Sequence, residues 1–139
     1  MRKVLSVMCI ILMPFMLASS AGAQSVTKWA NSIGPTFAKM DATYTQINAD
    51  LGKNVSVASI KILFQTYSSE VVDFASHADS PSKMLNADVR AISQVANTWA
   101  WIGYQTISDG AANLGPWKII NYRVTKAFLK LTNDLKNGR

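Results

Sequence analysis

The chain has 139 residues, of which 49% are hydrophobic and 16% are charged, and its formal net charge at pH 7 is +6. This length suits one domain with its own hydrophobic core and leaves little room for a second domain. Cys9 is the only cysteine, which excludes an internal disulfide and a cluster of thiolate metal ligands.

The N-terminal residues have the pattern of a cleaved export signal. Met1-Arg2-Lys3 is cationic, residues 4–17 are mostly apolar, and Ala21-Gly22-Ala23 has the small-x-small form at which signal peptidase cuts. We therefore predict a signal peptide over residues 1–23 and a single helical domain over residues 24–139. The mature domain has no cysteine, which favours a bacterial periplasmic or secreted protein over a eukaryotic secreted one.

Four stretches of the mature chain have apolar residues at intervals of three and four positions, and none alternates as a strand would. Each stripe predicts one amphipathic helix. The first comprises Trp29, Ile33, Phe37, Met40, Tyr44, Ile47 and Leu51, and the second comprises Val57, Ile60, Leu63, Phe64, Tyr67, Val71 and Phe74. The third comprises Leu85, Val89, Ile92, Val95, Ala96, Trp99, Ile102 and Gly103, and the fourth comprises Trp117, Ile120, Val124, Ala127, Phe128, Leu131 and Leu135.

Residues typical of helix ends separate the four stripes. We expect Asn54 to cap the second helix, and Pro81 to be the first residue of the third. Gly34-Pro35 interrupts the first stripe, so this helix either begins at Pro35 or is kinked there, because proline has no N–H to donate to the preceding turn.

Short connections between long helices predict an all-α, up-down antiparallel bundle of four, possibly three, helices after the signal peptide. Two alternatives fit the same pattern. One is a three-helix body with a loose arm before Pro35. The other is a pair of long hairpins that completes its core only on dimerisation.

The mature chain has few residues suited to catalysis. It contains one histidine and one glutamate. Glu70, Asp73 and His77 are spaced so that they share one side of the second helix, which makes them a weak candidate for a metal site. Such residues beside an apolar stripe are more often a solvated polar face. We expect no catalytic residues, no enzymatic activity, no metal and no cofactor.

Positive charge is concentrated near the C-terminus. Residues 115–139 contain six Lys or Arg and one Asp or Glu, whereas residues 24–114 contain six and seven. The last predicted helix therefore combines basic and apolar groups on the side away from its stripe. On the third predicted helix, Trp101 and Tyr104 also lie away from the core stripe. The candidate partner-binding residues are Lys118, Tyr122, Arg123, Lys126, Lys130, Trp101 and Tyr104.

These features predict a small exported protein that binds a protein partner at the cell envelope or outside the cell. A secretion or conjugation accessory, a periplasmic chaperone and an inhibitor are roles of this kind. The first alternative is a toxin-like protein that acts on anionic membranes through its basic C-terminal helix. The second alternative is a carrier of a small ligand or metal, and nucleic acid is an unlikely partner for an exported protein.

Overall fold

The computed structural model describes residues 21–51, 53–110 and 115–137. This part of the chain contains four helices and no strand, which confirms the all-α prediction and the number of helices. The helices are α2 (Ala21–Asp50), α3 (Val57–Ala75), α4 (Lys83–Ser108) and α5 (Gly115–Lys136). Residues 1–20 of the predicted signal peptide lie outside the described residues, so the export signal stays a prediction.

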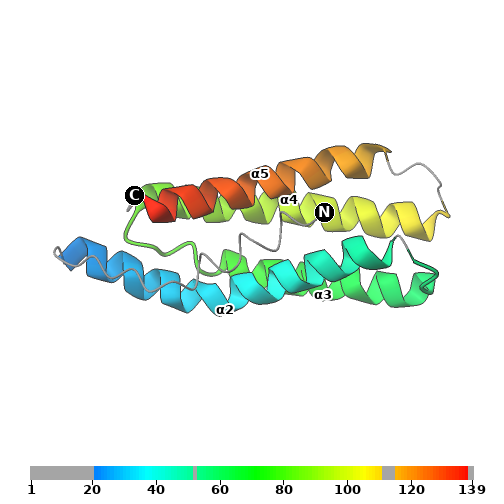
Figure 1. Ribbon diagram of the computed structural model, residues 1–139, viewed down its shortest axis with the longest axis horizontal. Helices are drawn as coiled ribbons and strands as arrows, with labels where there is room; N and C mark the ends of the chain where they lie inside the picture. Colours follow the sequence, from blue (N-terminus) through cyan, green and yellow to red (C-terminus); the bar gives the residue numbers. More distant parts are fainter. Residues whose placement is uncertain (1–20, 52, 111–114, 138–139) are drawn as a thin grey trace.

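The helices lie lengthwise beside one another in two pairs, α2 with α3 and α4 with α5 (Figure 1). Successive helices run in opposite directions, and the contact between α3 and α4 joins the two pairs. The two hairpins therefore cover each other within one chain. The alternative in which the hairpins need a second chain to complete their core does not describe this structure.

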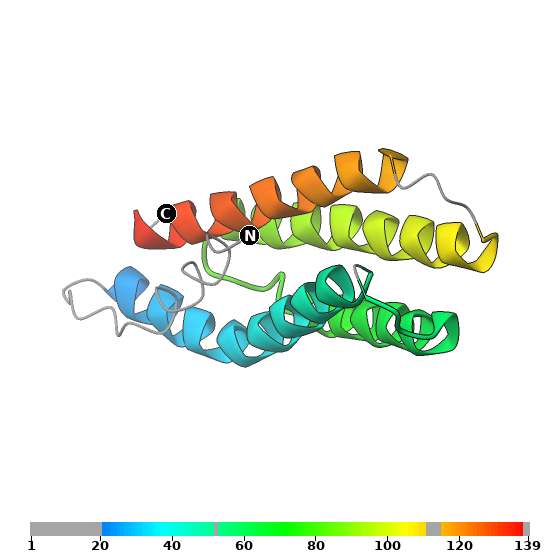
Figure 2. The ribbon, with the colours of Figure 1, turned by 45° about the vertical axis from the view of Figure 1, so that its right-hand side comes forward.

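Helix α2 continues through Pro35 instead of beginning there. It bends in its middle (Figure 2), as expected where proline removes one hydrogen bond from the helix. Trp29 and Ile33, on the N-terminal side of the proline, are buried in the core. The alternative of a three-helix body with a loose N-terminal arm was therefore wrong.

The structure corrects two predicted helix starts. Ser56 caps α3 instead of Asn54, and its side chain accepts a hydrogen bond from the backbone N–H of Ser59 at 3.2 Å. Ser82 caps α4, so Pro81 lies before the helix and is not its first residue. Both observed caps are serines, whose hydroxyl groups can accept hydrogen bonds from the unpaired N–H groups of the first helical turn.

The core consists mainly of the predicted stripes, with an aromatic cluster at its centre. Trp99 is fully buried, and its ring centroid lies 4.8 Å from that of Tyr44, 5.0 Å from that of Tyr67 and 5.3 Å from that of Trp117. The Tyr67 hydroxyl and the Trp99 and Trp117 indole N–H groups have no hydrogen-bond partner within the described residues. Ring packing, more than hydrogen bonding, therefore holds the centre of the bundle together. Val57, expected in the second stripe, is exposed.

Candidate partner-binding surfaces

Helix α5 presents large apolar side chains on the side opposite its buried stripe. Ile119 and Tyr122 are each 62% exposed, and Leu129 is also exposed. Lys126 lies among them, with its Nζ atom 5.4 Å from the centroid of the Tyr122 ring. Ile119, Tyr122, Lys126 and Leu129 follow one another at intervals of three and four positions over about 15 Å of helix. We refer to these four residues as the α5 ridge.

The other predicted cations of α5 differ in their surroundings. Arg123 is exposed beside the ridge, and Lys118 has a side chain outside the described part. Lys130 is paired with two carboxylates: its Nζ atom donates to Asp88 Oδ1 on α4 and, at 2.7 Å, to Asp134 Oδ2 on α5. Lys130, predicted to bind a partner, thus also has contacts within the chain. This lysine joins α4 to α5.

Asp88 is the ionisable residue that sequence analysis missed. It is 3% exposed, and its Oδ2 atom has no hydrogen-bond partner among the described residues. Burial raises the pKa of the Asp88 carboxyl, although the Lys130 ammonium acts in the opposite direction. Hydrogen bonds to Asp134 and, next, to Asp88 raise the pKa of Lys130. A sequence signal was present, because Asp88 follows Leu85 by three positions and so lies beside the core stripe.

The raised pKa of Asp88 predicts an unusual pH dependence of stability. The folded protein holds this proton more tightly than the unfolded chain does, so protonation favours folding. Burial also raises the pKa of Asp41. We therefore expect the free energy of unfolding to rise as the pH falls from neutral through the folded-state pKa of Asp88. Urea titrations at a series of pH values measure this change.

The Asp88→Asn variant provides the control for this pH dependence. It should remove the part of the rise that belongs to Asp88 and keep the part that belongs to Asp41. A wild-type protein that steadily loses stability over the same pH range would contradict the assignment.

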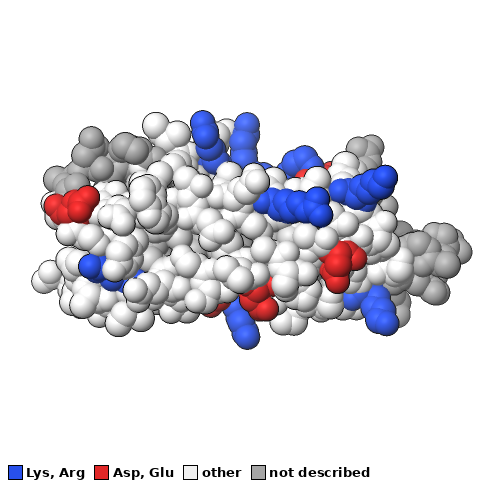
Figure 3. Space-filling model, turned by 180° about the vertical axis from the view of Figure 1, so that it is seen from behind, with Lys and Arg blue, Asp and Glu red and all other residues white. Residues whose placement is uncertain are grey.

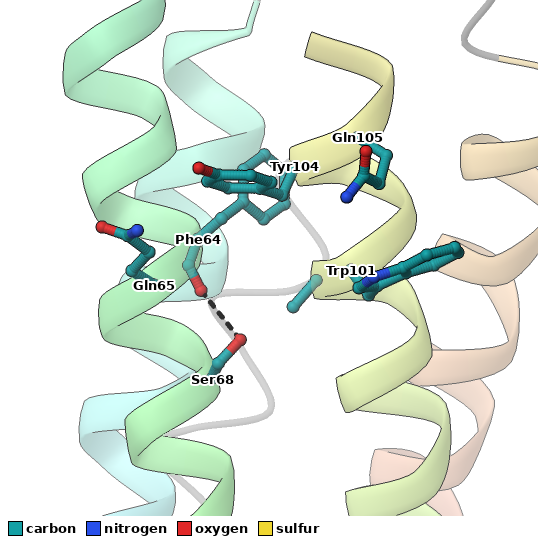
Figure 4. A pocket seen from close by; sticks show the side chains of 7 residues that line it. Phe64, Gln65, Ser68, Trp101, Tyr104 and Gln105 are labelled. Carbon is teal, nitrogen blue, oxygen red and sulfur yellow. Dashed lines mark hydrogen bonds between the residues drawn. The ribbon is translucent and has the colours of Figure 1, made fainter. Parts of the chain in front are cut away.

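Trp101 and Tyr104 do not share one environment. Trp101 is 64% exposed, whereas Tyr104 is half-buried and has Lys61 Nζ 4.8 Å from its ring centroid. Tyr104 turns toward Phe64 and α3, whereas the Trp101 indole lies across α4 and extends away from α3 (Figure 4). Between α3 and α4 lies a groove of about 360 Å³. It is lined by Phe64, Gln65, Ser68, Ala100, Trp101, Tyr104 and Gln105.

The weak metal candidate on α3 takes part in the contact between α2 and α3. Glu70 Oε1 accepts a hydrogen bond from Thr43 at 3.0 Å, and Asp73 Oδ2 accepts one from Thr36 at 3.2 Å. The backbone carbonyl of His77 accepts a hydrogen bond at 2.8 Å from the indole N–H of Trp29 on α2. In the part of the chain that the structure describes, no three His, Cys, Asp or Glu side chains are placed to hold a metal ion. The geometry gives these residues a structural role.

Comparisons with protein families, with curated proteins and with solved structures gave no match to this chain. In residues 21–51, 53–110 and 115–137, no helix is both long and apolar enough to cross a membrane.

Proposed function

We propose that this is a small exported protein that acts by binding an acidic protein partner through the α5 ridge, at the cell envelope or outside the cell. The observation that carries the proposal is the exposure of Ile119, Tyr122 and Leu129 around Lys126. Exposed apolar side chains that follow one helix face, with cations among and beside them, are typical of an interaction surface.

Export and a non-catalytic role are parts of this proposal. Export is supported by the cationic start, the short apolar stretch and the small-x-small sequence before Gln24. A non-catalytic role is supported by the use of the Glu70 and Asp73 carboxylates in the contact between α2 and α3. A basic, partly apolar surface attracts an acidic partner from a distance and then fixes it by burying the apolar groups.

The test compares two variants that remove exposed side chains of similar size. Tyr122→Ser combined with Lys126→Glu changes the α5 ridge, and Ile62→Ser changes an equally exposed site on α3. The full chain is expressed in its host, and the intact mass of the recovered protein shows whether residues 1–23 were removed. Proteins captured by the wild type are identified, and their affinities for wild type and both variants are measured at low and high salt.

We expect the α5 double variant to bind its partner at least about tenfold more weakly, because it loses an apolar contact and reverses a charge. Wild-type binding should weaken as salt is added, and Ile62→Ser should bind as the wild type does. Equal affinities of the two variants would contradict a role for the ridge. If anionic vesicles and no protein bind in a ridge-dependent manner, the membrane-active alternative replaces this proposal.

A further inference from the structure

The exposed side of α4 carries no charge over most of the length of the helix. Residues 91–108 of α4 contain no Asp, Glu, Lys, Arg or His. The solvent-exposed faces of helices ordinarily carry charged residues. Seen from the side where α3 and α4 lie in front, the molecule has a broad area without charged side chains (Figure 3). Its exposed residues on α4 include Ala91, Gln94, Asn97, Thr98, Trp101 and Gln105. We call these residues the neutral face.

The neutral face contains a protruding side chain and a hollow next to it. Trp101 projects into solvent at the rim of the groove between α3 and α4, which it helps to line (Figure 4). The groove has a volume of about 360 Å³ and has Phe64 and Tyr104 among its walls. A tryptophan buries roughly 150–250 Å² when it is enclosed, and aromatic rings pack well against each other. The groove can therefore accept an indole from another molecule.

We propose that a second copy of this chain docks on the neutral face, with Trp101 of each protomer in the groove of the other. A two-fold axis makes this arrangement possible, because a contact from one copy to its partner is repeated in the opposite direction. Trp101 and the groove lie on the same face, as such a symmetric contact requires. The proposal concerns a different surface from the α5 ridge and does not depend on the proposed function.

Charge favours the neutral face over α5 for self-association. The whole chain has a formal net charge of +6, and two copies repel each other where their cations face. Residues 91–108 carry no charge of their own, and Lys61 of α3, beside the Tyr104 ring, is a cation at the edge of the groove. The segment spans about 26 Å, and α3 and α4 together are about 20 Å wide, so the face can bury roughly 1,000 Å² in total. This area lies near the lower limit for specific interfaces and corresponds to a weak, concentration-dependent dimer.

The first experiment measures association by sedimentation velocity of the full chain, from micromolar to near-millimolar concentrations. We expect a monomer–dimer equilibrium that salt changes little. Trp101→Ser should raise the dissociation constant at least about tenfold, because it removes the central aromatic contact. Leu129→Ser, which changes an exposed side chain of the α5 ridge, should leave that constant unchanged. Thermal melts of both variants check that each remains folded.

A second experiment tests the exchange of side chains between copies. Ser68→Lys places a charged side chain in the groove and keeps Trp101, so this variant and Trp101→Ser should each associate weakly alone. Mixed together, they can form one contact, between Trp101 of the first variant and the groove of the second, which lacks only its own Trp101 side chain. We therefore expect the mixture to associate more tightly than either variant by itself.

The fluorescence of Trp101 gives an independent readout. The other three tryptophans, Trp29, Trp99 and Trp117, are buried, so quenching by acrylamide reports mainly on Trp101. Its quenching should decrease as the protein concentration rises. A protein that stays monomeric throughout, or a dimer that Trp101→Ser leaves unchanged, would overturn the proposal. A mixture that associates no better than its components would overturn the exchanged arrangement.

Discussion

Replacing Lys130 by Glu is expected to destabilise the protein by about 3 kcal/mol, because it leaves a buried carboxylate without its counter-charge. Asp88 is almost fully buried, and Lys130 is its ion-pair partner. The substitution also brings a third carboxylate beside Asp88 and Asp134. Solvent around the largely exposed Lys130 side chain screens part of the repulsion, which places the expected loss at the low end of the range for buried ion pairs.

Urea unfolding monitored by circular dichroism measures the loss. Lys126→Glu is the matched control, since it makes the same change on the exposed side of the same helix. We expect it to alter the free energy of unfolding by no more than about 0.5 kcal/mol. Lys130→Glu combined with Asp88→Asn should recover part of the lost stability. Equal effects of the two lysine substitutions would show that the ion pair with Asp88 is unimportant.

Gly103→Val is expected to destabilise the protein by about 3 kcal/mol through overpacking. A Cβ atom at Gly103 would lie 2.3 Å from Cζ of Phe64 and 2.8 Å from Nε1 of Trp117, well inside contact distance. Both rings are buried in the aromatic cluster and have little room to move. The glycine therefore lets α3, α4 and α5 approach one another closely at the centre of the bundle.

The control for this substitution is Gly34→Ala on α2, where an added Cβ would meet no atom of another helix within 4 Å. That variant should lose far less stability than Gly103→Val, because the helix preference of alanine opposes the crowding of its Cβ against the ring of Pro35. Guanidinium titrations of both variants give the comparison. A Gly103→Val protein as stable as the wild type would mean that the Phe64 ring can shift at little cost.

The helices and most of the core could be predicted from sequence because they depend on local periodicity. Trp29, Ile33 and Phe37 recur at helical intervals, and such an apolar stripe is buried in a helical bundle whatever the arrangement of the helices. The pairing of Lys130 with Asp88 could not be predicted in the same way, since 42 positions separate the two residues. It depends on how far α5 is shifted along α4, and stripes of similar residues allow several such shifts.

For the candidate sites, too, sequence predicts local placement on a helix but not the contacts between helices. Glu70 and Asp73 lie on α3 as their spacing predicted, whereas His77 lies beyond the end of this helix at Ala75. The contacts of all three depend on where α2 lies. Trp101 was correctly expected away from the core stripe. The groove next to it combines residues of two helices, and its existence follows from the packing of α3 on α4.

The order of the helices also bears on how the chain folds. Each helix packs on the one that follows it, so most contacts form between segments close in sequence. Tyr44 joins α2 to α5 through its hydroxyl, which donates to Asn121, 77 positions away. Bringing such distant segments together requires closure of a much longer loop than forming a hairpin does. We therefore infer that the hairpins form early and that the contact between α2 and α5 closes last, in the microsecond-to-millisecond folding typical of helical bundles with local contacts.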